Sequence, residues 1–200
     1  MLSIITNVCC NILDCLKNWA VQLDNSGGPL VTYSILTICT FIHLYSDGWV
    51  FSLSTLSTQP FAIIGYQFTH ANLGHLFSNA LFLLFIGPTC EKYLGHTKFL
   101  LLFLVSGILS ALGFTLVMSN AQVVGASGAI SGLLAIFPFV QKRFYEIIGA
   151  SVICALYFWL QVLAAIRDVQ LPFFATTAHL AHVLGGVVGL GMFAYFFRRE

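Results

Sequence analysis

Residues 123–132 read VVGASGAISG, in which Ser127 lies between glycines where a polar turn meets an apolar segment. We expect a helix to begin near Ser127, which places its N–H in the first turn, where backbone donors have no intrahelical partner. The helix dipole at that end favours developing negative charge, and Gly125 and Gly128 leave room for another chain to approach the hydroxyl. The stretch suits a nucleophile beside half of an oxyanion hole. Small residues of this kind also form packing surfaces between membrane helices.

The composition indicates a membrane protein with several spans. Apolar residues make up 58% of the 200 residues and charged residues 8%, a balance that excludes a water-soluble globular core. The net charge of +1, without a basic run, gives no reason to expect nucleic acid as a partner. The six cysteines are scattered and form no Cys-x-x-Cys pair, so we predict neither a disulfide framework nor a zinc site. No metal and no cofactor is expected.

Charged and turn-forming residues divide the chain into six apolar segments. We predict a cytosolic or interfacial segment over residues 1–28 and a six-helix membrane domain over residues 29–200, an all-α polytopic fold. Residues 46–69 would form an interfacial loop anchored by Trp49, Phe51 and Tyr66, and residues 91–98 a charged connection. The predicted spans are residues 30–45, 71–87, 99–117, 127–141, 147–166 and 177–197.

The basic residues orient this topology. Six spans put both termini on one side of the membrane, and Arg167 is the one basic residue expected on the other side. The other basic residues all fall on the side of the termini: Lys17, Lys92, Lys98, Lys142, Arg143, Arg198 and Arg199. By the positive-inside rule both termini are cytoplasmic. Because neither a transit peptide nor a soluble extension is visible, we expect a bacterial plasma (inner) membrane.

Four polar residues on three predicted helices share one depth. A helix rises about 1.5 Å per residue, so Ser127 and His182 lie about 22 and 24 Å from the cytoplasmic ends of their spans. The same count places Asn79 and His75 about 20 and 26 Å from that boundary. Since the hydrocarbon layer is about 30 Å thick, all four fall in its outer half. The shared depth indicates a site that opens towards the extracytoplasmic side.

His182 is the candidate base for Ser127. Gly185 and Gly189 form a GxxxG surface that allows close helix approach, which would bring His182 against the helix of Ser127. The alternative is a histidine that only packs between helices. His179, one turn earlier, is a rival base or an orienting neighbour.

His75 and Asn79 are spaced i, i+4 and therefore share a helix face. They suit a pair of oxyanion donors, although polar membrane residues also form hydrogen bonds between helices. His70 would brace the loop at the membrane entrance, and Ser131 is interpreted as a packing residue.

The ordered motifs resemble the rhomboid family. Residues 70–79, HANLGHLFSN, resemble the second-helix pattern HxxxxHxxxN, and residues 91–95, EKYLG, resemble the connection that follows it. Residues 125–128, GASG, match the family's GxSG, and residues 181–185, AHVLG, resemble the sixth-helix histidine pattern. The resemblance covers about residues 30–197 and implies a minimal six-helix rhomboid core.

The resemblance implies an intramembrane serine protease that cleaves single-span transmembrane substrates within or near the lipid bilayer. It assigns a Ser127–His182 dyad with no third, acidic member. The Ser127 N–H and the side chains of His75 and Asn79 would form the oxyanion hole. Many rhomboids carry an aromatic residue four positions after the nucleophile, where this chain has Ser131.

Two alternatives remain open at this point. The first is a catalytically inactive rhomboid-like protein that acts as a membrane binding or chaperone module. The second is a small transporter or an intramembrane metalloenzyme that uses His70, His75, His179 and His182. The sequence has no HExxH motif, no intramembrane carboxylate and no visible inverted repeat to support the second. No oligomeric state is predicted.

Overall fold

The computed structural model describes residues 28–118, 121–170 and 178–198. Apart from Gly28, the predicted N-terminal segment of residues 1–28 lies outside these ranges. The α-helices are α2 (Leu30–Tyr45), α3 (Ala62–Gly65), α4 (Leu73–Val117), α5 (Ser127–Ile136), α6 (Phe144–Gln170) and α7 (His179–Phe197). Short 3₁₀ turns form η1 (Leu53–Thr55), η2 (Tyr66–Phe68) and η3 (Phe137–Val140).

Most predicted spans coincide with helices, but the second does not end where the sequence suggested. Helix α2 has the predicted bounds, and α5 with η3 covers residues 127–140. The expected end of the second span at residue 87 is wrong, whereas the connection expected over residues 91–98 does contain the break between the two helical segments. The helix runs on through Pro88, and α4 breaks only at Gly95, whose φ is +75°. Glycine adopts this left-handed conformation without a steric penalty, so one residue makes the turn.

The long helices identify a membrane bundle. Within the described ranges, three helices are long and apolar enough to cross a membrane: Leu73–Val117, Phe144–Arg167 and His179–Phe197. Leu30–Tyr45 and Ser127–Val140 are shorter apolar helices. Among the described residues, extended pairing is limited to an isolated antiparallel bridge between Phe51 and Val123.

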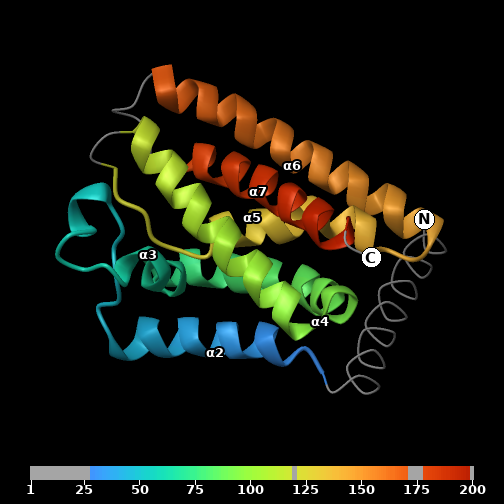
Figure 1. The fold of residues 1–200 in the computed structure, drawn as a ribbon, viewed down its shortest axis with the longest axis horizontal. Helices are drawn as coiled ribbons and strands as arrows, with labels where there is room; N and C mark the ends of the chain where they lie inside the picture. Colours follow the sequence, from blue (N-terminus) through green and yellow to red (C-terminus); the bar gives the residue numbers. More distant parts are fainter. Residues whose placement is uncertain (1–27, 119–120, 171–177, 199–200) are drawn as a thin grey trace, which may run out of the picture.

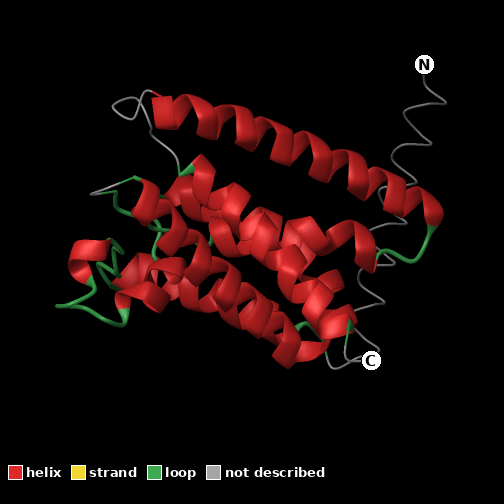
Figure 2. Ribbon diagram, turned by 45° about the horizontal axis from the view of Figure 1, so that its top comes forward, coloured by secondary structure: helices red, strands yellow, loops and turns green. Residues whose placement is uncertain are grey.

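Helix α5 forms the centre of the bundle. It packs against α4, α7 and η3, while α2 packs on α4 and α6 packs on α7. Figure 1 shows α2 and α6 on opposite sides, with α5 and α7 between them. Every residue of α5 after Ser127 is buried. In contrast, α6 lies along the outside of the bundle (Figure 2) and exposes large apolar side chains such as Leu156, Trp159 and Leu160.

Glycines bring α5 and α7 into backbone contact. A Cβ atom on Gly185 would overlap the backbone of Gly128, and one on Gly189 would overlap the backbone of Gly132. The close approach expected from the Gly185 and Gly189 pair is therefore present. It fixes the N-terminal half of α7 against α5.

A buried carboxylate anchors α2 to α4. Glu91 is 2% exposed and accepts hydrogen bonds from the N–H groups of Val31 and Thr32, each at 2.8 Å. The Thr32 hydroxyl donates to the same carboxylate at 2.6 Å, and His96 Nδ1 lies 2.6 Å from Glu91 Oε1. Pro29 provides no side-chain cap for α2, so Glu91 satisfies first-turn donors that the helix leaves unpaired.

The loop over residues 46–69 is folded onto the bundle more deeply than the sequence suggested. Trp49 is 39% exposed, but Phe51 and Tyr66 are 0% and 1% exposed, so the prediction that they anchor the loop at the interface is wrong. Phe51 pairs with Val123 through two backbone hydrogen bonds of 3.0 and 2.8 Å. The Tyr66 hydroxyl donates to the carbonyl of Gly107 at 2.7 Å. Both rings pack in one buried apolar cluster that includes Ala111 and Phe114 of α4.

Candidate active site

The turn before Ser127 is held by the preceding loop. Gly125 has a φ of +104°, and its N–H donates to the carbonyl of Tyr66 at 2.9 Å. The bridge between Phe51 and Val123 holds the turn two residues earlier. Helix α5 then begins at Ser127, as the sequence predicted, so the Ser127 N–H lies in the first turn, where donors have no intrahelical acceptor.

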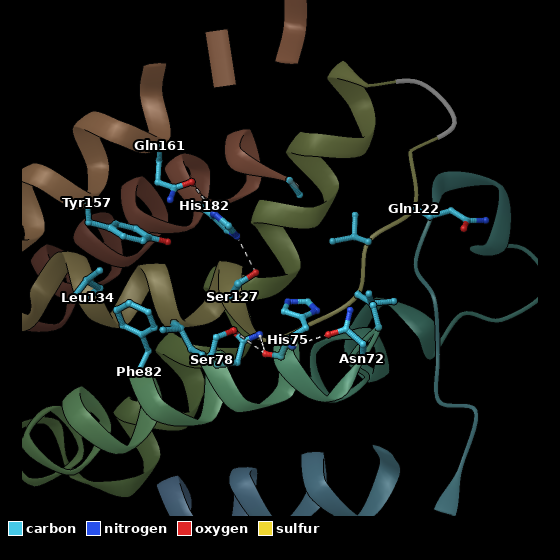
Figure 3. A pocket seen from close by; sticks show the side chains of 16 residues that line it. Asn72, His75, Ser78, Phe82, Gln122, Ser127, Leu134, Tyr157, Gln161 and His182 are labelled. Atoms are coloured by element: carbon cyan, nitrogen blue, oxygen red, sulfur yellow. Dashed lines mark hydrogen bonds between the residues drawn. The ribbon is translucent and has the colours of Figure 1, made fainter. Parts of the chain in front are cut away.

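Ser127 contacts the histidine that the sequence paired with it. His182 lies in the first turn of α7 and is 8% exposed. Its Nε2 is 2.9 Å from Ser127 Oγ, and Figure 3 shows the two side chains pointing towards each other from α5 and α7. The contact of Gly185, about one turn after His182, with Gly128, the residue next to Ser127, makes this approach possible.

The second ring nitrogen of His182 contacts a residue that the sequence analysis missed. His182 Nδ1 is 2.8 Å from Oε1 of Gln161 on α6 (Figure 3). His179 Nδ1 is 2.7 Å from the same oxygen. The sequence did offer one signal for this role: Gln161 is the one amide side chain within the largely apolar stretch of residues 147–166.

Tyr157 supplies an aromatic neighbour for His182 from α6. The two ring centroids are 6.4 Å apart and their planes meet at 34°. The Tyr157 hydroxyl lies 2.9 Å from Ser131 Oγ, and Ser131 donates to the carbonyl of Ser127 at 2.8 Å. Ser131 is fully buried, in line with its interpretation as a packing residue. An aromatic ring is thus present near the histidine, although position 131 does not provide it.

His75 and Asn79 lie on the α4 side of the same site. The His75 ring packs against Gly125, where a Cβ atom would meet it. The space beside Gly125, which the sequence analysis expected to admit another chain, is therefore filled by the His75 ring. The backbone N–H of His75 donates to Oδ1 of Asn72 at 2.9 Å. Asn79 Nδ2 donates to the backbone carbonyl of His75 at 3.0 Å. The Asn79 amide is thus engaged within its own helix.

His70 lies just before α4. It is 6% exposed, and its ring lies edge-on to that of His75, with 5.2 Å between centroids. Burial, reinforced by the nearby His75, lowers the pKa of His70 from its ordinary value to about 4. His70 is therefore neutral at physiological pH.

Ser127 and His182 line a cavity of about 540 Å³. Helices α4 to α7 and the turn before α5 all contribute to its wall. Its lining residues include His75, Asn79, Ser127, Tyr157, Gln161 and His182. Figure 3 shows that His75 and His182 approach Ser127 from opposite sides. In the part of the chain that the structure describes, no group of three His, Cys, Asp or Glu side chains is arranged to hold a metal ion.

Comparison with protein families agrees with this arrangement of motifs. The model of the Rhomboid domain matches residues 57–199. The chain belongs to the rhomboid family. Membership of this family and the apolar helices make it an integral membrane protein. Rhomboids are generally intramembrane serine proteases, although some plant members are inactive.

Individual rhomboids from bacteria and plants are similar to the chain. It is 27% identical over 189 residues to the rhomboid protease GlpG of Yersinia pestis, an alignment covering 85% of this chain and 63% of that protein. It is 35% identical over 133 residues to the chloroplastic rhomboid-like protein 11 of Arabidopsis thaliana, covering 62% and 48%. It is 30% identical over 121 residues to the rhomboid protease GluP of Bacillus subtilis, covering 58% and 23%. The chain therefore spans less than two thirds of the length of each.

Proposed function

We propose that this rhomboid is an intramembrane serine protease in which Ser127 is the nucleophile and His182 the general base. The observation that carries the proposal is the 2.9 Å contact between Ser127 Oγ and His182 Nε2 within the cavity. A serine activated by an adjacent base is a recurrent arrangement for acyl transfer. Membership of the rhomboid family supports the same chemistry.

The proton path follows from the contact. His182 Nε2 accepts the Ser127 hydroxyl proton while Oγ attacks the carbonyl carbon of the scissile peptide bond. The resulting imidazolium then donates that proton to the leaving amine, which breaks the C–N bond and leaves an ester on Ser127. A water molecule, deprotonated by His182, hydrolyses the ester and regenerates the hydroxyl.

The oxyanion hole is proposed to lie on the α4 side of Ser127. The backbone N–H of Ser127 and the side chains of His75 and Asn79 are its donors. One such donor is typically worth about 2.7–4 kcal/mol of transition-state stabilisation. Asn79 Nδ2 donates one of its two hydrogens to the His75 carbonyl in this structure, which leaves the second for the oxyanion.

The proposed topology has six spans and cytoplasmic termini. The break at Gly95 divides α4 into residues 73–94 and 96–117, each long enough to cross the hydrocarbon layer. With α2, α5 plus η3, α6 and α7, these make six. The basic residues favour cytoplasmic termini, which puts Ser127 in the outer half of a bacterial plasma membrane. Residues 1–28 would precede this membrane domain of residues 29–200.

Single-span transmembrane proteins are the proposed substrates. The peptide bonds of a transmembrane helix are hydrogen-bonded and shielded, so the substrate must unwind locally before its carbonyl reaches Ser127. Small or helix-breaking residues near the cut are expected for this reason.

Cleavage of a reconstituted substrate tests the proposal against the inactive alternative. We expect the wild-type protein in proteoliposomes to convert a panel of single-span substrates into two fragments each. Mass spectrometry of the fragments is expected to place the cut within or beside the membrane-spanning segment. Stable binding of the whole panel without any cleavage would instead identify a binding module.

A further inference from the structure

Gln161 links α6 to the catalytic histidine of the proposed mechanism. Its Oε1 lies 2.8 Å from His182 Nδ1 and 2.7 Å from His179 Nδ1. An amide oxygen has two lone pairs and can only accept hydrogen bonds. Both histidines must therefore carry a proton on Nδ1 to make these contacts.

This requirement selects one tautomer of His182. A neutral imidazole has a single N–H, so a proton on Nδ1 leaves the lone pair on Nε2. Nε2 is the atom 2.9 Å from Ser127 Oγ. In the opposite tautomer, Nε2 would donate to Ser127, and the Nδ1 lone pair would face the lone pairs of the Gln161 oxygen. That tautomer cannot accept the hydroxyl proton.

We propose that Gln161 is a positioning residue that holds His182 in the Nδ1–H tautomer and orients its ring towards Ser127. This inference rests on the proposed protease function. When Nε2 takes the Ser127 proton, the Nδ1–H bond to Gln161 becomes charge-assisted and strengthens. A neutral amide provides this support without an ionised carboxylate inside the membrane, which would be costly.

Helix α6 contributes a second contact that favours the same ring orientation. Tyr157 precedes Gln161 by about one turn, and its ring lies 6.4 Å from that of His182. Tyr157 is itself held by its hydroxyl contact with Ser131 on α5. The histidine therefore has Ser127 on one side and the Tyr157 and Gln161 side chains on the other.

A purely structural role for Gln161 makes a different prediction. If its amide only joined α6 to α7, its loss would lower stability and leave the tautomer of His182 unchanged. His179 provides the matched control, because it shares the Gln161 oxygen. Removing the His179 ring leaves the bond between Gln161 and His182 available.

The tautomer can be measured directly by ¹⁵N NMR of protein labelled at histidine nitrogen. We compare wild type, Gln161→Met and His179→Ala in detergent micelles, with His182→Ala identifying the signal. We expect the Nδ1–H tautomer in wild type and in His179→Ala. In Gln161→Met, which keeps the side-chain length and lacks the amide acceptor, we expect a substantial Nε2–H population. Gln161→Leu repeats the test if the methionine variant folds poorly.

Kinetics provide the second readout. We expect Gln161→Met to lower kcat for a single-span substrate at least about tenfold with KM within about twofold, because the lost interaction acts on the chemical step. An unchanged Nδ1–H tautomer in both Gln161→Met and Gln161→Leu overturns the inference. A shifted tautomer in a protein whose wild type cleaves nothing contradicts the proposed function instead.

Discussion

Replacing His182 by alanine is expected to lower kcat for a single-span substrate by about 10²–10⁴-fold, the usual contribution of a positioned general base. The imidazole is the group that contacts Ser127 Oγ, at 2.9 Å. Among the described residues, no carboxylate lines the cavity to replace it. Without that base the hydroxyl keeps its proton and attacks slowly. The measurement is cleavage in proteoliposomes under saturating substrate.

His43→Ala is the matched control for this experiment. His43 lies on α2 and does not line the cavity, so its replacement is expected to leave kcat within about twofold. Thermal unfolding of each variant establishes that the bundle is intact. A His182→Ala protein that cleaves within tenfold of wild type would remove His182 from the mechanism.

Replacing Glu91 by alanine is expected to destabilise the bundle by about 3–5 kcal/mol, the usual cost of removing one partner from a buried charged network. The loss leaves two backbone N–H groups and a hydroxyl at the start of α2 without their acceptor. Each unsatisfied buried donor costs about 1–3 kcal/mol. For a chain of this size we expect a fall in Tm of about 10 °C or more, measured by thermal unfolding in detergent.

Glu91→Gln separates hydrogen bonding from charge. The amide keeps the shape of the side chain and one acceptor oxygen, so we expect it to lose less than half as much stability. An alanine variant with the wild-type Tm would show that α2 is held to α4 by apolar packing alone.

The contact between Ser127 and His182 was accessible from the sequence because three independent signals converged on it. The turn before residue 127 predicted a helix that begins near Ser127, depth counting put His182 at the same level, and Gly185 and Gly189 allowed close helix approach. These features are local in sequence, and α5 and α7 face each other through them.

The contribution of α6 was not accessible in the same way. Its sequence is apolar nearly all round, so no hydrophobic face fixes its rotation about its own axis. That rotation decides whether Gln161 and Tyr157 point at His182 or at lipid. The tertiary structure supplies this information, through the packing of α6 on α7.

The errors in the loop and in α4 have a common cause. Phe51 and Tyr66 were assigned from residue type, which favours aromatic residues at the interface, and Glu91 was assigned to a charged connection. In the structure each is buried because a distant segment provides its partner: Val123 for Phe51, Gly107 for Tyr66, and the start of α2 for Glu91. Such long-range pairings leave no local pattern.

The most direct test of the account is covalent labelling with a fluorophosphonate, a reagent that reacts with base-activated serines. We predict a single adduct, mapped by mass spectrometry to Ser127 in the wild-type protein and absent from the folded His182→Ala variant. An adduct on another serine, or labelling of Ser127 at the same rate without His182, would contradict the proposed dyad.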